Sequence, residues 1–204
     1  MKLYYSPGAC SLAPIILAEW LGQDLDIEKV DLRNPSPDWL EKNPLGAVPA
    51  LELDDGTVRN QVDAILQYLC ALSPESGLGG SSDAVEQFEV HRWAAFLTGD
   101  FHPPWGVWFG PARYTSDHSD ASLAAVREAT QERIARVTGI LESQVSDNGH
   151  IALGRRTFLD AYAFAMVRWQ KNIGDFDEYP KLANFMSKMK QDPGVQRALE
   201  RERS

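Results

Sequence analysis

The sequence predicts a small α/β domain followed by an all-helical domain. Three observations support this division. Over the first seventy residues, segments with the hydrophobic periodicity of strands alternate with segments that have the periodicity of helices. A stretch rich in Gly and Ser follows. The rest of the chain has only helical periodicity. We therefore expect residues 1–74 to form the α/β domain, residues 75–84 a linker, and residues 85–204 the helical domain.

The first elements follow from short apolar segments and their breakers. Residues 2–5 form a candidate strand that a Pro-Gly pair ends. The helix after it is marked by apolar positions four residues apart, Leu12, Ile16 and Trp20. Gly22 is expected to end this helix. Residues 25–32 have an extended pattern whose apolar positions change phase, which predicts a bulge or a shorter strand.

The sequence of the second half of this domain predicts a β-hairpin followed by a helix. Residues 48–53 form a third strand, the Asp-Asp-Gly sequence at 54–56 is a hairpin turn, and Thr57 begins the antiparallel partner. The next helix has one apolar face, made by Val62, Ile65, Leu66 and Leu69. The predicted order is β-α-β followed by β-β-α.

Two helices stand out in the helical domain. A long amphipathic helix has its apolar positions three and four residues apart at Leu123, Val126, Thr130, Ile134, Val137 and Leu141. Residues 158–169 are apolar on most sides, so this helix is expected to be central. Thr157 and Asp160 form a capping box that would begin it.

Composition and charge exclude several classes of protein. The 204 residues are 44% hydrophobic, 24% charged and carry a net charge of −9, which leaves no basic surface for nucleic acid or an anionic membrane. No segment approaches the roughly 20 apolar residues that cross a bilayer, and the N-terminus lacks the pattern of a secretory signal. We expect a cytoplasmic protein that acts on a small molecule.

Cys10 is the residue with the clearest chemical potential. It follows a strand and a Pro-Gly turn and lies where a helix begins, so backbone N–H groups and the helix dipole are expected to lower its thiol pKa. The alternative is a small buried hydrophobic residue. Ala13 replaces the second cysteine of a redox pair, so any mixed disulfide would need an external thiol to resolve it.

Pro49 precedes an apolar strand, at a position where a residue without an N–H is unusual. A cis bond between Val48 and Pro49 would explain it and would present the Val48 backbone to an extended peptide ligand. An ordinary trans proline at the first residue of a strand is the alternative.

Four segments in order resemble the glutathione transferases, most closely the bacterial beta class. These segments are residues 4–13 (YYSPGACSLA), 43–51 (NPLGAVPAL), 64–69 (AILQYL) and 157–162 (TFLDAY). The resemblance spans nearly the whole chain. It implies a thioredoxin-like N-terminal domain, a helical C-terminal domain, glutathione as co-substrate, no metal, and a homodimer.

The resemblance also implies roles for particular residues. Cys10 would contact the glutathione sulfur, and Val48 with cis-Pro49 would pair with the cysteinyl backbone. The start of the following helix, at Gln61 and Val62, would hold the γ-glutamyl carboxylate, because helix N-termini bind anions. The serine usual in the family is replaced by Val62, so one hydrogen bond to that carboxylate is expected to be lost.

His102 matches the histidine that beta-class proteins bring toward the cysteine, where it would donate a hydrogen bond to the sulfur or orient it. A purely structural histidine is the alternative. Tyr5 matches the N-terminal tyrosine of that class and is a third candidate catalytic residue. Its alternative is a strand residue whose hydroxyl reaches solvent.

An aromatic cluster around His102 is the candidate pocket for an apolar electrophile. Its members are Phe101, Trp105, Trp108, Phe109 and Tyr114. Prolines and glycines at 103–111 are expected to break the helix here into a loop beside a cleft, although such clusters also form ordinary cores.

Three functions remain open at this point. The first is a transferase that adds glutathione to an apolar electrophile. The second is a thiol-disulfide oxidoreductase that uses Cys10. The third is a noncatalytic binding or regulatory protein on the same fold, which the altered carboxylate site would favour.

Overall fold

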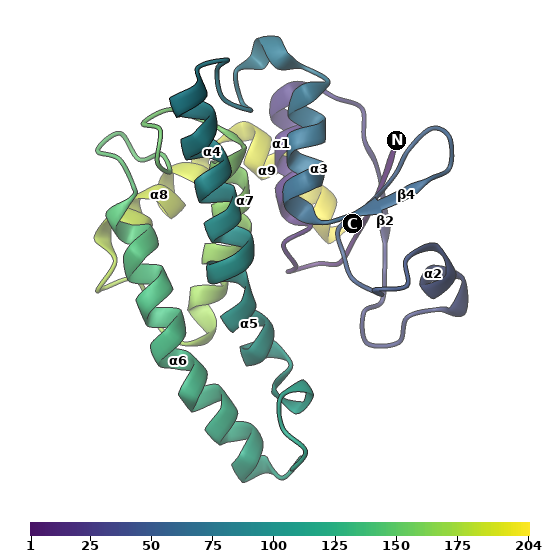
Figure 1. The fold of residues 1–204 in the computed structure, drawn as a ribbon, viewed down its shortest axis with the longest axis vertical. Helices are drawn as coiled ribbons and strands as arrows, with labels where there is room; N and C mark the ends of the chain where they lie inside the picture. The colour runs from purple at the N-terminus through teal and green to yellow at the C-terminus, as the bar shows by residue number, and fades with distance from the viewer.

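A four-stranded mixed sheet organises the N-terminal part of the computed structural model, which describes residues 1–204 (Figure 1). The strands are β1 (Lys2–Tyr5), β2 (Asp26–Lys29), β3 (Ala50–Glu52) and β4 (Val58–Asn60). They lie in the order β2-β1-β3-β4, with β1 parallel to β2 and the other two pairs antiparallel. The strands thus follow the predicted order, β-α-β and then β-β-α, and all four belong to one sheet.

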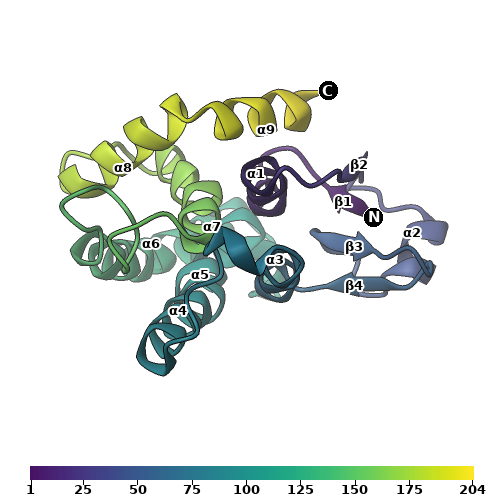
Figure 2. The same cartoon turned by 90° about the horizontal axis from the view of Figure 1, so that it is seen from above.

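Helices cover both faces of this sheet (Figure 2). The helix α1 (Leu12–Leu21) and the helix α3 (Val62–Ala71) lie on the face toward the helical domain, and the short α2 (Pro37–Lys42) lies on the other. Side chains of β1 alternate accordingly, since Leu3 belongs to the large core and Tyr4 packs against Trp39 of α2. The N-terminal helix ends as predicted at Gly22, which has a φ of 64°.

Six helices make the C-terminal part. They are α4 (Ala84–Phe96), α5 (His102–Phe109), α6 (Asp120–Ser143), α7 (Phe158–Val167), α8 (Pro180–Gln191) and α9 (Pro193–Arg203). A π-helical segment, Leu97–Phe101, joins α4 to α5, and 3-10 turns lie at Pro74–Ser76, Pro111–Arg113 and Arg168–Asn172. None of the helices combines the length and the hydropathy that a membrane span needs.

The helix α7 is central, as its sequence predicts, and every one of its residues is buried. It packs against α1 of the other domain, and α9 also crosses over α1 (Figure 2). The carboxylate of Asp160 accepts hydrogen bonds from the backbone N–H groups of Thr157 and Ile151, each at 2.8 Å. Asp160 therefore fixes the start of α7, whereas the Thr157 hydroxyl has no hydrogen-bond partner.

One sequence-based expectation is confirmed and two need correction. The strand expected at 25–32 is limited to Asp26–Lys29, in line with its change of phase, and the strand expected at 48–53 begins only at Ala50. The loop expected at 103–111 is wrong, because residues 102–109 are helical. Its two prolines occupy the first turn of α5, where a missing N–H costs little, and the wider π turn precedes them.

Candidate active site

A cleft of about 660 Å³ separates the two parts of the molecule at the loop that follows β1. Residues 6–10 and 45–48 form the wall on the side of the sheet. Residues from α5, together with the 3-10 turn Arg168–Asn172, form the opposite wall. Both Cys10 and His102 line this cleft, so the docking of the two parts brings together two residues 92 positions apart in the sequence.

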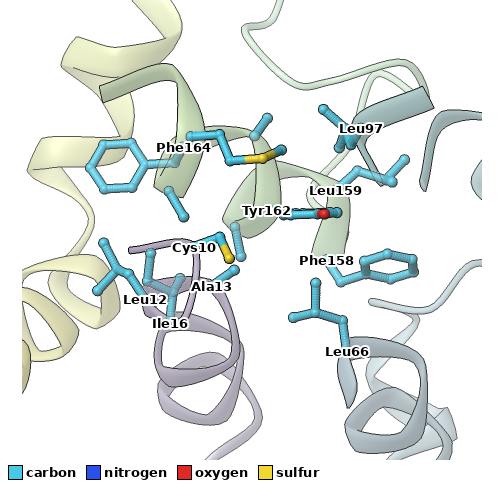
Figure 3. Close-up of a cluster of buried hydrophobic side chains, with 14 of the residues drawn as sticks. Cys10, Leu12, Ala13, Ile16, Leu66, Leu97, Phe158, Leu159, Tyr162 and Phe164 are labelled. Carbon is cyan, nitrogen blue, oxygen red and sulfur yellow. The ribbon is translucent and has the colours of Figure 1, made fainter. Parts of the chain in front are cut away.

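Cys10 lies at the base of the cleft, two residues before the first residue of α1. Its side chain is only 4% exposed and points among apolar residues of α1, α3 and α7 (Figure 3). The Sγ atom lies 3.7 Å from the carbonyl oxygen of Val48, to which the thiol donates. The predicted position is thus correct, and the sulfur contacts the predicted backbone.

The expected activation of this thiol is wrong for the ligand-free protein. Burial raises the pKa of Cys10 to about 12, while its own backbone N–H and the charge of Arg168 act in the opposite direction. Desolvation of the sulfur beneath α7 thus outweighs the helix start, from which a lowered pKa was expected. Cys10 is therefore a neutral thiol, able to donate a hydrogen bond.

We expect Cys10 to react slowly with iodoacetamide for this reason. At pH 8 its rate in the folded protein should be at least about 100-fold below that of free cysteine, because only the thiolate reacts. Mass spectrometry of a Cys70→Ala protein measures this rate, and the same protein unfolded in urea gives the unprotected reference. A folded-state rate equal to that of free cysteine would contradict the buried neutral thiol.

The loop that carries Cys10 is held by an ion pair from the C-terminal helices. Arg168 donates to both carboxylate oxygens of Glu202, each at 2.7 Å, and to the carbonyl oxygen of Ala9 at 2.8 Å. Glu202 in turn accepts a hydrogen bond from the N–H of Gly8 at 3.1 Å, and Trp169 Nε1 donates to the Gly8 carbonyl oxygen at 2.8 Å. We call Arg168, Glu202 and Trp169 the loop clamp.

The second backbone segment of the cleft contains the predicted cis bond, between Val48 and Pro49. The side-chain amide of Asn43, 1% exposed, donates to the carbonyl oxygen of Ala47 at 2.7 Å. Asn60 of β4 donates to Asn43 Oδ1 at 3.2 Å. The segment before Pro49 is thus fixed to the sheet, with Val48 on the cleft wall and Pro49 behind it.

Gln61 and Val62 lie at the start of α3, outside the residues that line the cleft. Gln61 has a φ of 77°, a left-handed conformation that is uncommon for a side chain of this kind. Val62 is 5% exposed and packs in the core, so it offers no polar side-chain group at the helix N-terminus.

His102 lines the cleft at the first residue of α5, with its ring 5.3 Å from that of Trp169. Burial lowers its pKa below the usual 6.5, so the imidazole is neutral at physiological pH. No hydrogen bond joins its ring to Cys10. Any influence of His102 on the sulfur must therefore be that of a neutral group.

Tyr5 is not brought to the cleft. It is 3% exposed on β1 and packs in the large core, so neither its expected catalytic position nor a hydroxyl in solvent agrees with the structure. A strand side chain at this position faces α1 and α3 because alternate residues of β1 point to opposite faces.

The predicted aromatic pocket is mostly core. Phe101 and Trp105 are 1% and 0% exposed, Trp108 is partly buried against the core, and Tyr114 is 58% exposed away from the cleft wall. Only Phe109 lines the cleft, where it meets a ring that the sequence did not single out, that of Trp169. Periodicity placed Trp169 inside a helix, whereas the chain there turns into a 3-10 segment facing the cleft.

Two family models match most of the chain. The N-terminal domain model of glutathione S-transferases matches residues 8–72, and the C-terminal domain model matches residues 100–202. Among curated proteins, glutathione S-transferase GST-4.5 of Xanthomonas campestris is 35% identical, over 99% of this chain and 98% of its own. Glutathione S-transferase GstA of Escherichia coli O157:H7 is 32% identical, over 99% and 98% of the two chains.

Solved structures agree with these matches. A bacterial beta-class glutathione S-transferase of Sphingomonas chungbukensis has a TM-score of 0.86 at 33% identity, covering 99% of this chain and 98% of that one. A glutathione S-transferase of Xylella fastidiosa has a TM-score of 0.89 at 35% identity, covering 98% of both chains. A sphingomonad glutathione S-transferase in complex with glutathione has a TM-score of 0.85 at 33% identity, covering 99% and 98%.

Proposed function

Because the chain belongs to the glutathione S-transferase family, we propose that the cleft beside Cys10 is where glutathione meets an electrophile. The protein is a transferase with glutathione as its co-substrate, and the relatives favour catalysis over a noncatalytic role. We further propose the domain division 1–74, 75–84 and 85–204. The observation that carries the proposal is the contact of the Cys10 thiol with the Val48 carbonyl at the base of the cleft.

In this proposal, glutathione lies extended along the wall on the side of the sheet. The Val48 backbone, presented before cis-Pro49, pairs with the cysteinyl residue as one strand pairs with another. The γ-glutamyl carboxylate lies at the start of α3, where the backbone N–H groups near Gln61 and Val62 favour an anion.

Cys10 acts in this arrangement as a hydrogen-bond donor. Glutathione releases its thiol proton to water, and the neutral Cys10 thiol leaves the Val48 carbonyl and donates to the glutathione sulfur, which stabilises the thiolate. That thiolate attacks the electrophilic carbon, a C–S bond forms, and the leaving group departs with the electron pair of the bond that breaks. Arg168 and the neutral His102 complete the polar surroundings of the two sulfur atoms.

An ordinary conjugation assay tests this function. With 1-chloro-2,4-dinitrobenzene, the protein should raise the rate of glutathione conjugation well above the rate in buffer, and the rate should saturate with glutathione. A protein with no glutathione-dependent rate for this and other haloarenes would contradict the proposal and would restore the noncatalytic alternative.

Val62→Ser should tighten glutathione binding by about 10-fold, because it returns a hydroxyl donor to the carboxylate site at a gain of roughly 1.5 kcal/mol. Calorimetric titration measures the affinity. Val62→Ala is the matched control, since it loses similar volume without adding a hydroxyl, and it should bind no more tightly than wild type. Equal affinity of the Ser and Ala variants would place the γ-glutamyl group elsewhere.

A cytoplasmic homodimer is the proposed state of the protein. Two successive α-helices of the chain, α3 and α4, expose the large apolar side chains Tyr68, Val85 and Phe88, which are 38%, 72% and 64% exposed. Such a surface is costly in water unless a partner covers it. Both cysteines are free thiols, as expected in a reducing compartment. Light scattering that shows only monomer at micromolar concentration would contradict the dimer.

A further inference from the structure

The cleft has the opposite charge to the rest of the chain. The protein carries a net charge of −9, yet no Asp or Glu side chain lines the cleft, while Arg113, Arg168 and Lys171 do. A cleft lined by one sign of charge concentrates ions of the opposite sign. An uncharged electrophile does not account for this separation of charge, whereas an anionic ligand does.

Two of the three cations are free to bind a ligand. Arg168 is engaged, since its guanidinium already donates to Glu202 and to the Ala9 carbonyl. Arg113 and Lys171 are exposed and have no carboxylate partner in the structure. Arg113 folds over the end of α5, where its Cδ and Nε atoms would lie 3.6 Å from a Cβ built on Gly110.

Aromatic rings lie beside these free cations. The rings of Phe109 and Trp169 meet edge to face at 5.5 Å, and the ring of His102 lies 5.3 Å from that of Trp169. All three residues line the same wall as Arg113 and Lys171. This wall can therefore contact a planar ligand on its rings while the cations at its edge receive an anionic group.

We propose that the second substrate is an aromatic electrophile that carries an anionic group such as a carboxylate or sulfonate, which Arg113 and Lys171 recognise. This proposal rests on the function proposed above. Glutathione also has carboxylates, but in the proposed arrangement its cysteinyl backbone pairs with Val48 on the opposite wall and its γ-glutamyl carboxylate lies at the start of α3, outside the cleft lining. In the reaction the glutathione sulfur replaces a leaving group such as chloride, and the anionic group takes no part in bond making.

A matched pair of substrates tests the charge preference. The pair is 4-chloro-3,5-dinitrobenzoate and its uncharged methyl ester, with each kcat/KM divided by the uncatalysed rate to remove intrinsic reactivity. Wild type should prefer the acid by about 10-fold, and added salt should reduce this preference. Arg113→Gln and Lys171→Gln should each lower the acid-to-ester ratio by about 3- to 5-fold, as expected for an exposed ion pair.

Lys190→Gln is the control, because it removes one exposed charge of α8 far from the cleft lining and should leave the ratio unchanged. A wild-type ratio near one would overturn the proposal. It would also be overturned if the two variants raised the KM for glutathione while keeping the ratio, since the cations would then serve glutathione.

Binding measurements test the preference for an anionic substrate independently of the transferase activity. Calorimetry with 3,5-dinitrobenzoate and its methyl ester, in the presence of S-methylglutathione, needs no turnover and should show tighter binding of the acid in wild type but not in the double variant. An inactive protein that still prefers the acid would refute the transferase function alone. Equal binding of acid and ester would refute the anionic substrate alone.

Discussion

Cys10→Ala should abolish any protein-catalysed reduction of glutathione mixed disulfides, an activity that the buried neutral thiol keeps slow in wild type, while only weakening conjugation. Enzyme-catalysed exchange through a mixed disulfide on the protein needs the small thiolate fraction of Cys10, so the rate above that of free glutathione alone should disappear in this variant. Conjugation uses the sulfur of glutathione itself, and the loss of one hydrogen bond to that sulfur should lower kcat/KM by about 10-fold. Both activities are measured on the same protein, with hydroxyethyl disulfide and 1-chloro-2,4-dinitrobenzene as substrates.

Cys10→Ser separates the two roles further. The hydroxyl still donates a hydrogen bond but does not exchange with disulfides, so conjugation should recover most of the loss and disulfide reduction should not. If conjugation fell in both variants as far as disulfide reduction, the Cys10 sulfur would be the nucleophile of both reactions, and its role as a neutral donor would be wrong.

Glu202→Ala should destabilise the protein by about 3 to 5 kcal/mol in free energy of unfolding, because it leaves the charge of Arg168 without its partner in a largely buried place. Side-chain exposures of 16% for Arg168 and 7% for Glu202 support this magnitude. Denaturation in urea measures the loss. The Cys10 loop should also loosen, so alkylation of Cys10 should become faster.

Two further variants serve as controls for the stability of the Glu202→Ala protein. Glu200→Ala, at an exposed position of the same helix without an ion pair, should cost less than about 0.5 kcal/mol. Glu202→Gln keeps an acceptor for the Gly8 N–H and should fall between the alanine variant and wild type. Equal stability of the Glu200 and Glu202 alanine variants would mean that the loop clamp contributes nothing measurable.

The fold could be predicted from the sequence because its signals are local. The β1 strand, the end of α1 at Gly22, the apolar face of α3 and the Asp160 cap of α7 each depend on residues a few positions apart. The one element predicted with the wrong secondary structure, the loop expected at 103–111, was expected because its prolines were taken to break the helix. Whether a proline breaks a helix depends on its place within a turn, which the sequence does not define.

The site was harder to predict because distant segments build it. Sequence motifs identified Cys10 and Val48. The opposite wall, however, depends on where α7 ends and a 3-10 turn begins, because this turn directs Trp169 and Lys171 toward the cleft. The thiol pKa was misjudged for the same reason, since burial by α7 outweighs the nearby helix start. The loop clamp joins residue 8 to residue 202, a pairing that no local pattern contains.

A crystal structure of the protein in complex with glutathione tests most directly the proposed position of glutathione beside Cys10. We expect glutathione extended along the sheet-side wall, with its cysteinyl backbone paired to Val48 and its sulfur within hydrogen-bonding distance of Cys10 Sγ. Glutathione bound in another groove, or in this cleft with its sulfur turned away from Cys10, would contradict it.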